Sequence, residues 1–501
     1  MKILVVLASY GHNNDRYLAR VLEEYRSMQR TSTHEIDVVI VSNGPKDLAS
    51  DSDCVEVVIG LPSKNPYSLP FAHKKVMAEH ADRYDLFIYS EDDILITERN
   101  IEAFLGATKV LHDGEVAGFV HAEADAEGNL YFDPPHASFH WQPDSVTKRG
   151  DYTFAYYTNE HAAAFMLTRQ QLQQAIASGG FLVAPHEGRY EIRETAATDP
   201  YTQCGFRKLI GISHLEQFTI RHLPANKLSI RPYRAKAEFE RQIDALLSLG
   251  KSGHPQGSLF QGETKVRHRK WSKDYYEPVN MGVVSRVPQD ARTVLSMGCG
   301  WGATEAALAA KGMRVVGVPM DSVIAACAEA KGVEIVHGDF AAARAQLRDE
   351  RFDCILMLSV LHLVPDPIAV LASFSQLLAP GGTIAVTAPN FAQITTLWRR
   401  LRGQNKELYA RLGDYEASGI HATTPRLMRS WFRKAGLSLQ GVEHVLPPRA
   451  ESANRMTLGL ADFLLGEEMI CVGSSKKGIL QAFHPSTTRT DSALAGSSAQ
   501  S

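Results

Sequence analysis

The stretch TVLSMGCGWGATEAAL, residues 293–308, decides the fold of the carboxyl half, because it joins an apolar strand pattern to a helix pattern through three glycines. Gly298, Gly300 and Gly302 let the backbone approach a ligand closely and tolerate positive φ angles. A helix that begins directly after such a turn offers free backbone amides. The stretch therefore predicts a ligand-binding strand-to-helix turn, with a tight turn that holds no ligand as the alternative.

Short apolar runs alternate with helical patterns on both sides of this stretch, which is typical of parallel α/β sheets. After the glycines we expect strands at Arg314–Val318, Val333–Val336, Phe352–Met357 and Thr383–Thr387. Near the amino end we expect strands at Ile3–Ala8, Ile36–Ser42, Val55–Ile59 and Leu86–Tyr89, and a helix at Phe71–Ala81. A further helix is expected between the first two strands, where apolar residues repeat at helical spacing: Leu18, Val21, Leu22, Tyr25 and Met28. The fold class is thus α/β, with two doubly wound domains at 1–232 and 263–484. A helix and linker at 233–262 connect them, and a Ser- and Ala-rich tail at 485–501 is expected to be disordered.

The composition excludes several classes of protein. A net charge of -3 over 501 residues argues against a broad basic face for nucleic acid, so no nucleic-acid partner is expected. The six cysteines form no CxxC pair and no zinc spacing. No apolar run approaches the roughly 20 residues that cross a bilayer. We therefore expect a cytoplasmic protein without a transmembrane segment, and a peripheral membrane contact stays open.

Four segments follow one another in the carboxyl half: GCGWG at 298–302, HGDF at 337–340, SVLHLVPDP at 359–367 and LLAPGGTIAVTAPN at 377–390. Together they resemble the ordered motifs of class I S-adenosylmethionine-dependent methyltransferases. The resemblance implies a Rossmann-like sheet with S-adenosylmethionine as cofactor. It also implies contacts from the loop residues Gly298, Cys299, Gly300 and Gly302, and from Asp339 to the adenine.

Two positions depart from that family's pattern. An acid usually stands two residues before the first glycine, where this chain has Ser296, and another closes the second strand, where it has Pro319. The second acid binds the ribose, so its loss weakens cofactor binding by about 1.5–3 kcal/mol unless another group replaces it. Asp321 is the candidate replacement, and a helix N-cap is the alternative role for it. A scaffold with a degenerate methyltransferase domain is the corresponding rival function.

Two histidines are candidate bases for methyl transfer. His362 lies in the loop after the fourth strand of the domain, where an open α/β sheet binds ligands. His421, in GIHATTPRL, precedes a helix in the region where the family often places its acceptor-side cover. For each of them an ordinary loop histidine is the alternative interpretation.

In the amino half an apolar strand runs directly into Glu91, Asp92 and Asp93. Adjacent carboxylates repel one another unless a cation or hydrogen bonds compensate, and oxygen ligands suit Mg²⁺ or Mn²⁺. The alternative is a solvated acidic turn. These acids resemble the DxD-type motif of GT-A glycosyltransferases, and VLASYGHNNDRYLARVLEEY at 6–25 resembles the first strand and turn of that family.

The glycosyltransferase resemblance implies roles for further residues. Asp93 and His222 would be metal ligands, and Glu91 and Asp92 would contact the sugar or ribose of a nucleotide sugar. Ser9 and Tyr10 stand in the first turn, where the base is commonly held. In RETAATDPY, Asp199 or Glu194 would deprotonate the acceptor, and loop or helix-start acids are the alternative.

Taken together, the sequence predicts a bifunctional transferase. It would add a sugar from a nucleotide-sugar donor to a surface glycan, and it would O-methylate a sugar hydroxyl, as in polysaccharide biosynthesis. The expected partners are the nucleotide sugar and the glycan acceptor. The alternative is a methyltransferase that acts on a lipid or small metabolite, with an amino half that binds glycan without catalysis.

Overall fold

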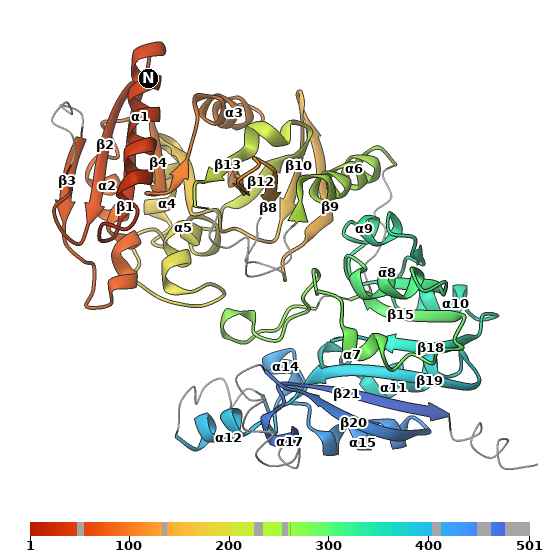
Figure 1. Cartoon of the computed structure of the whole chain (residues 1–501). Helices are drawn as coiled ribbons and strands as arrows, with labels where there is room; N and C mark the ends of the chain where they lie inside the picture. The colour runs from red at the N-terminus through yellow and green to blue at the C-terminus, as the bar shows by residue number, and fades with distance from the viewer. Residues whose placement is uncertain are drawn as a thin grey trace, which may run out of the picture.

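The computed structural model describes residues 1–47, 55–132, 138–224, 234–252, 259–260, 262–402, 412–447 and 462–475. The predicted disordered tail at 485–501 and residues 253–258 of the predicted linker lie outside these ranges. Figure 1 shows two halves, here called the amino half (residues 1–252) and the carboxyl half (residues 259–475). Within the described residues, no helix combines the length and the apolar character that a membrane span needs.

The amino half is built on a five-stranded sheet in the order β11-β4-β1-β2-β3. Its strands are β1 (Lys2–Ser9), β2 (Glu35–Ser42), β3 (Val55–Ile59), β4 (Leu86–Glu91) and β11 (Ala164–Thr168). All neighbours are parallel except β11, which is antiparallel to β4. The interior residues of β1 are apolar and buried on both faces, which is typical of a central parallel strand.

The amino half departs from the predicted doubly wound domain, because strands between residues 94 and 235, apart from β11, form two smaller mixed sheets. One has the order β6-β12-β10-β9, with β6 (Glu115–Ala117), β9 (Trp141–Arg149), β10 (Tyr152–Tyr157) and β12 (Arg207–Gly211). The other has the order β14-β8-β7-β13-β5, with β5 (Ile94–Leu95), β7 (Val120–Ala124), β8 (Leu130–Phe132), β13 (Thr219–His222) and β14 (Arg234–Ala235). The turn between β9 and β10 is too short for a crossover helix, so these strands pair antiparallel.

Helices cover these sheets. They are α1 (Asp15–Thr31), η1 (Pro66–Phe71), α2 (Ala72–Glu79), α3 (Glu98–Thr108), α4 (Arg169–Ala177), α5 (Ile192–Thr202), η2 (Ile212–Phe218) and α6 (Lys236–Ser252). The helix expected at Phe71–Ala81 begins earlier, as the 3-10 helix η1, because Pro66 and Pro70 suit a tight first turn. The apolar face of α1 packs on the sheet through the predicted helical repeat Leu18, Val21, Leu22, Tyr25 and Met28.

The carboxyl half holds a seven-stranded sheet in the order β17-β16-β15-β18-β19-β21-β20. Its strands are β15 (Thr293–Cys299), β16 (Arg314–Pro319), β17 (Glu334–Ile335), β18 (Phe352–Met357), β19 (Leu378–Pro389), β20 (Leu437–Val445) and β21 (Glu468–Ser475). The first five are parallel, and β21 inserts antiparallel between β19 and β20. The helices and 3-10 turns are η3 (Arg267–Arg269), α7 (Met281–Val284), α8 (Ala303–Ala309), α9 (Ala325–Glu329), α10 (Phe340–Gln346), η4 (Leu361–Leu363), α11 (Pro367–Ser375), α12 (Ile394–Leu401), α14 (Tyr415–Ser418), α15 (Pro425–Lys434) and α17 (Asp462–Leu465).

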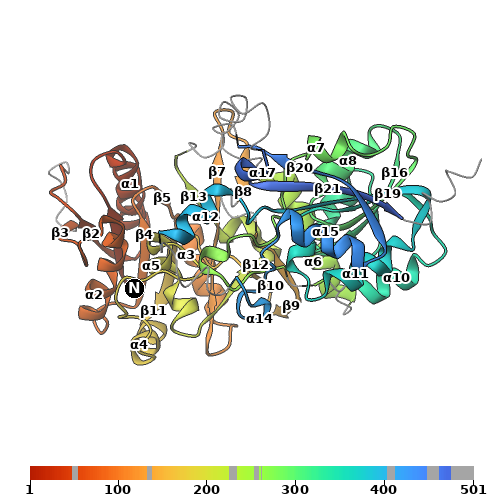
Figure 2. The ribbon, with the colours of Figure 1, turned by 90° about the horizontal axis from the view of Figure 1, so that it is seen from below.

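Helix α6 belongs to both halves. Its apolar residues Phe239, Ile243 and Leu246 are part of the buried core of the amino half. Its Gln242 is fully buried, donates to the Sγ of Cys327 at 3.8 Å and accepts from the hydroxyl of Tyr276 at 3.1 Å. The predicted helical piece is therefore a packed element that joins the halves, which lie side by side in Figure 2.

A second connection is the segment of residues 262–277, here called the strap. It lies between the two halves in Figure 1, in green, ahead of α7. The backbone amide of His268 donates to Gly188 O at 3.0 Å, and the guanidinium of Arg269 donates to Ser138 O at 3.0 Å. The strap therefore ties the carboxyl half to loops of the amino half.

Candidate functional site

The glycine-rich loop joins β15 to α8 as predicted. Gly298 and Gly302 have φ angles of +78° and +80°, which favour glycine. A Cβ atom on Gly298 would lie 2.3 Å from Val360 Cγ2, and one on Gly302 would lie 2.5 Å from Ala328 Cβ. Both glycines are thus required by the packing of the loop, independently of any ligand.

The strap packs directly on this loop. Tyr275 O accepts a hydrogen bond of 2.9 Å from the amide of Trp301, and a Cβ on Gly300 would lie 2.1 Å from the same oxygen. The ammonium of Lys273 donates to Leu358 O at 2.8 Å, just after β18, and pairs with Glu277 at 2.9 Å. Burial raises the pKa of Glu277 to about 7 although Lys273 acts to lower it. The strap therefore fixes one side of the loop.

A buried acid lies beside Ser296, the position where the family pattern has an acid. The hydroxyl of Ser296 donates to Glu305 Oε1 at 2.6 Å, and both residues are buried. Glu305 stands in the first turn of α8, nine residues further along the chain. The sequence analysis missed it because a motif comparison position by position does not look for a replacement from the following helix.

Asp321 and Asp339 both cap helical turns. Asp321 Oδ1 accepts from the amides of Val323 and Ile324 at 2.9 and 2.7 Å, and Asp339 Oδ1 accepts from Ala342 at 2.8 Å. This is the N-cap geometry that was the alternative role for Asp321. Its second oxygen lies 3.1 Å from Nδ1 of His140 in the amino half, so this carboxylate joins the halves. Contacts of Asp321 with ribose and of Asp339 with adenine remain predictions.

His362 and His421 are both held by backbone carbonyls. His362 is buried, with its Nε2 3.0 Å from Trp271 O, and burial lowers its pKa to about 4. His421 Nε2 lies 3.0 Å from Val364 O, and its ring stacks on Tyr415 at 4.6 Å. The amide of His421 donates to His362 O at 2.8 Å, so the two loops lie side by side. A ring with a pKa near 4 is neutral at pH 7 and a weak base, so the geometry gives His362 a positioning role.

Comparison with known proteins identifies this half. A family model described as a methyltransferase domain matches residues 269–441. The ubiquinone biosynthesis O-methyltransferase of Xylella fastidiosa is 30% identical over 174 residues, which cover 33% of this chain and 69% of that protein. The chain belongs, through its carboxyl half, to the class I S-adenosylmethionine-dependent methyltransferases.

Other relatives match the same methyltransferase domain over different lengths. The corresponding enzyme of Pseudomonas putida is 30% identical over 138 residues, so that 25% of this chain is covered and the chain spans 60% of that relative's length. A crystal structure of an S-adenosylmethionine-dependent methyltransferase from Mesorhizobium loti is 16% identical with a TM-score of 0.28, covering 38% of this chain and 95% of that one.

The loop of the methyltransferase domain fits S-adenosylmethionine, the cofactor that the family implies. Gly298, Gly300 and Gly302 keep the backbone of this turn free of side chains at the carboxyl end of the central strand β15. Cys299 is buried inside this turn. The loop backbone would hold the methionine part of the cofactor, and Lys273 brings a cation beside the same loop.

The predicted acidic cluster of the amino half lies at the carboxyl end of β4. Asp92 accepts from the hydroxyl of Ser9 at 2.5 Å and from Nδ2 of Asn14 at 2.8 Å, and Asn14 also donates to Asp93 at 3.1 Å. Burial raises the pKa of Asp92 to about 6. Burial, together with its acidic neighbours, raises the pKa of Glu91 to about 8. The acidic cluster is therefore a buried, hydrogen-bonded group, which disfavours the solvated-turn alternative.

His222 lies close to Asp93, as the metal hypothesis requires, but its ring is placed between two carboxylates. Nε2 is 3.4 Å from Asp93 and Nδ1 is 2.8 Å from Glu123 on β7. Burial would lower the pKa of His222, but these carboxylates outweigh it and raise the pKa to about 9. The described part of the chain holds no group of three or more His, Cys, Asp or Glu side chains arranged for a metal. The assignment of Asp93 and His222 as metal ligands stays a prediction, and the sequence analysis missed Glu123.

The two candidate acceptor-side acids lie in different environments. Asp199 is fully buried, forms an ion pair with Lys74 and lies 3.0 Å from Nε2 of His186. Glu194, one turn earlier on α5, lies on the wall of a pocket. The geometry therefore favours Glu194 over Asp199 as a base that reaches an acceptor.

Two pockets meet at the end of β4. The smaller, of about 350 Å³, is lined by Tyr10, Asn14, Tyr67 and Asp92. The larger, of about 610 Å³, contains Glu194 and His222 and extends to the strap. Glu91 and Arg193 line both pockets, so these two residues stand between them. Ser9 lies beneath Asp92, whereas Tyr10 is 54% exposed and accessible to a ligand.

Proposed function

We propose that the carboxyl half transfers a methyl group from S-adenosylmethionine to a hydroxyl oxygen, and that the natural acceptor is a sugar. The observation that carries this proposal is the glycine-rich loop at the end of β15, in a domain that the methyltransferase family model matches. Two relatives are named O-methyltransferases, which supports an oxygen acceptor. A lipid or small-metabolite acceptor is the alternative.

When bound, S-adenosylmethionine supplies an electrophilic methyl group, and the chain must orient the acceptor and exclude water. The loops that carry His362 and His421 lie against each other through the 2.8 Å hydrogen bond between them. These loops stand at the carboxyl end of β18, next to the glycine-rich loop. We propose that they position the acceptor hydroxyl, and that its proton passes to solvent or to a group on the acceptor side.

Calorimetry on the full chain tests the cofactor assignment. We expect S-adenosylmethionine and its demethylated product to bind with measurable heat, and adenosine, which lacks the methionine part, to bind far more weakly. Radiolabelled methyl transfer to oligosaccharides, and to quinol or lipid extracts, then identifies the acceptor class. Absence of binding heat with both cofactor forms would refute methyl transfer, and label in lipid alone would refute the sugar acceptor.

We propose a second function, glycosyl transfer from a nucleotide sugar, for the amino half. The supporting observation is the pair of neighbouring pockets at the end of β4, a small one and a larger one, which share Glu91 and Arg193 in their walls. The small pocket has a size and polarity that suit a nucleoside, and the larger one contains Glu194 as a candidate base. The acceptor would be a growing glycan.

Release of nucleoside diphosphate from a panel of nucleotide sugars tests this second function. The measurement is made with glycan acceptors, with Mn²⁺ and with excess chelator. The sequence predicts that Mn²⁺ or Mg²⁺ is required, with Asp93 and His222 as its ligands, and the nearest atoms of these two side chains lie 3.4 Å apart. We expect release of diphosphate that excess chelator abolishes. Full release in chelator would refute the metal requirement, and no release under any condition would refute glycosyl transfer.

A further inference from the structure

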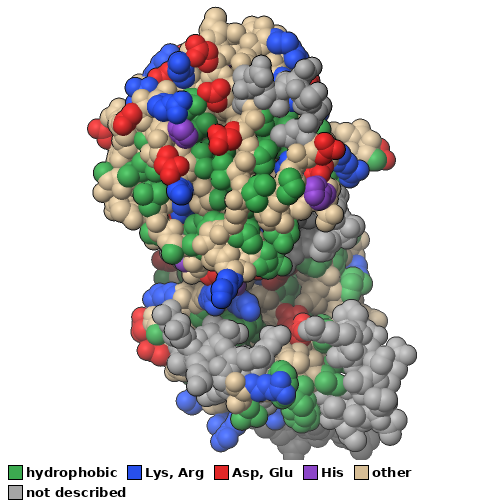
Figure 3. Space-filling model, turned by 90° about the vertical axis from the view of Figure 1, so that its left-hand side faces the viewer, with side chains coloured by type: hydrophobic (Ala, Val, Ile, Leu, Met, Phe, Trp, Pro, Cys, Tyr) green, Lys and Arg blue, Asp and Glu red, His purple; other side chains and the backbone are tan. Residues whose placement is uncertain are grey.

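The larger pocket is formed by both halves of the chain and is called here the interdomain pocket. From the amino half its wall includes Ser138, Phe139, Arg189 and Tyr190. From the strap it includes His268, Arg269, Lys270, Ser272 and Asp274. Figure 3 shows basic side chains, in blue, beside the hollow between the upper and lower parts of the molecule. A ligand in this pocket therefore contacts both halves.

Arg269 is the buried cation of this pocket. Only 6% of the residue is exposed, and its guanidinium lies 4.0 Å from the centre of the Phe139 ring. Nη2 donates to Ser138 O and pairs with Glu263. Among the described residues, neither Nε nor Nη1 has a hydrogen-bond partner, although both atoms are buried. Buried donors without partners are costly, so a ligand oxygen that reached Nε or Nη1 would remove that cost.

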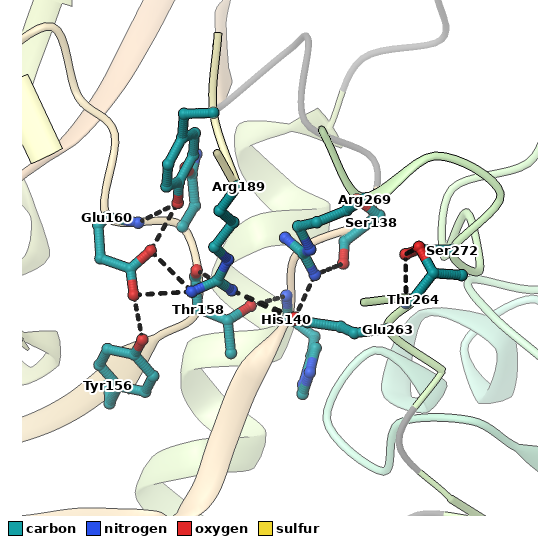
Figure 4. A network of polar contacts seen from close by, with 12 residues as sticks. Ser138, His140, Tyr156, Thr158, Glu160, Arg189, Glu263, Thr264, Arg269 and Ser272 are labelled. Atoms are coloured by element: carbon teal, nitrogen blue, oxygen red, sulfur yellow. Dashed lines mark hydrogen bonds and ion pairs between the residues drawn. The ribbon is translucent and has the colours of Figure 1, made fainter. Parts of the chain in front are cut away.

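The surroundings of Arg269 hold it in place, as Figure 4 shows. Glu263 also pairs with Arg189 at 3.2 Å, and Arg189 contacts both oxygens of Glu160 at 3.0 Å. The hydroxyl of Tyr190 donates to Glu160 at 2.6 Å. Because this network fixes the guanidinium before a ligand arrives, binding costs little side-chain entropy.

Backbone strain is concentrated at the same place. In the strap, His268, Arg269 and Trp271 have φ angles of +56°, +51° and +62°, and Ala163 on the opposite wall has +53°. Non-glycine residues adopt such angles at a cost, and they persist where the surrounding structure or a function requires them. The strain therefore agrees with a strap whose side chains are presented to a ligand.

The chemistry of the wall selects a class of ligand. Arg193 and Lys270 add two further cations, while Glu191, Glu194 and Asp274 offer carboxylate acceptors. Phe139 and Tyr190 stack at 5.6 Å and give the wall an aromatic face. A wall that mixes cations, acceptors and aromatic rings suits a ligand with several hydroxyls and an anionic group, because each hydroxyl donates to a carboxylate and the anion meets a guanidinium.

We propose that the interdomain pocket binds the phosphate ester of a sugar, with the phosphate on Arg269 and Lys270. This proposal deepens the glycosyl transfer proposed above and rests on it for the role of the ligand as the acceptor. A phosphate ester also occurs in the nucleotide donor, and the smaller pocket already offers a nucleoside site. We assign the phosphate on the strap to the acceptor, and competition with UDP distinguishes it from the phosphates of the donor. On this assignment the carboxyl half is a determinant of acceptor specificity.

Calorimetry on the full chain tests the proposal with glucose 1-phosphate, methyl glucoside and UDP as probes. We expect glucose 1-phosphate to bind about tenfold or more tightly than methyl glucoside, since a charged hydrogen bond is lost with the phosphate. Arg269→Lys should weaken glucose 1-phosphate by a similar factor. Lys270→Ala, at an exposed position whose loss spares the core, should also weaken it. Arg348→Lys, at a distant exposed arginine, is the matched control and should change nothing.

Equal affinity for the phosphorylated and neutral sugars would overturn the proposal, as would wild-type affinity in both strap variants. If UDP displaces glucose 1-phosphate, the phosphate site belongs to the donor and the acceptor assignment is overturned. If UDP and glucose 1-phosphate bind at the same time, the acceptor assignment is supported. The diphosphate-release assay separates the two claims. If glucose 1-phosphate binds but no diphosphate is released, glycosyl transfer is refuted and the interdomain site stands. If diphosphate is released but glucose 1-phosphate does not bind, the interdomain site is refuted and glycosyl transfer stands.

Discussion

Gly300→Ala is expected to weaken S-adenosylmethionine binding by about tenfold to a hundredfold, which corresponds to the 1–3 kcal/mol typical of overpacking. The added Cβ would lie 2.1 Å from the oxygen and 2.8 Å from the carbonyl carbon of Tyr275. These are backbone atoms, so the clash cannot be relieved by a side-chain rotation. Either the strap or the loop must move, and both form the cofactor side of the methyltransferase domain.

Calorimetric titration of the Gly300→Ala protein measures this effect, with the thermal midpoint recorded alongside. Gly441→Ala is the matched control, because a Cβ there meets no atom within 4 Å, and it should bind the cofactor like the wild type. Wild-type affinity in Gly300→Ala would show that the strap is not part of the cofactor site. Equal weakening in both variants would show that the loss is not specific to the loop.

Asp199→Asn is expected to destabilise the chain by about 3–5 kcal/mol, the usual cost of removing one partner of a buried ion pair. Asp199 and Lys74 are 0% and 3% exposed, so the ammonium would remain buried without a counter-charge. Urea unfolding measures the loss. Asp85→Asn breaks a half-exposed pair with Arg169 and should cost less than about 1 kcal/mol.

Glu194→Gln is the companion variant at the same helix. It should leave the unfolding free energy near the wild-type value and reduce diphosphate release by about 10²- to 10⁴-fold, the range for loss of a general base. Stability of Asp199→Asn equal to the wild type would contradict the structural role of Asp199. Unchanged turnover in Glu194→Gln would remove Glu194 as the candidate base.

The sequence predicted those parts of the structure that depend on local pattern. The turn at Gly298–Gly302 and the helix α1 follow from spacing alone, since glycine positions and apolar periodicity are set within a few residues. The acids at Glu91–Asp93 were placed correctly at a strand end for the same reason. Several strand bounds differ from the prediction by one or two residues, which is the ordinary uncertainty of element ends.

The sequence did not predict contacts between distant segments. Glu123 reaches His222 across 99 residues, and Arg269 reaches Ser138 across 131 residues. No local sequence pattern predicts such contacts, because the two residues are brought together only when separate helices, strands and loops pack against one another. Residues 263–277 of the strap were assigned to the methyltransferase domain without a role, because only their contacts with the amino half show what they do.

Helix α6 has a consequence for synthesis on the ribosome. The amino half emerges first, but the later of the two carboxyl-half partners of Gln242 is Cys327, 85 residues further along the chain. At translation rates of about 5–20 residues per second, one face of α6 waits roughly 4–17 s for its partner. During that interval a nascent chain exposes a helix surface that the finished protein buries. A chaperone that binds amphipathic segments near the exit tunnel would meet α6 in that interval and release it once α9 has been made.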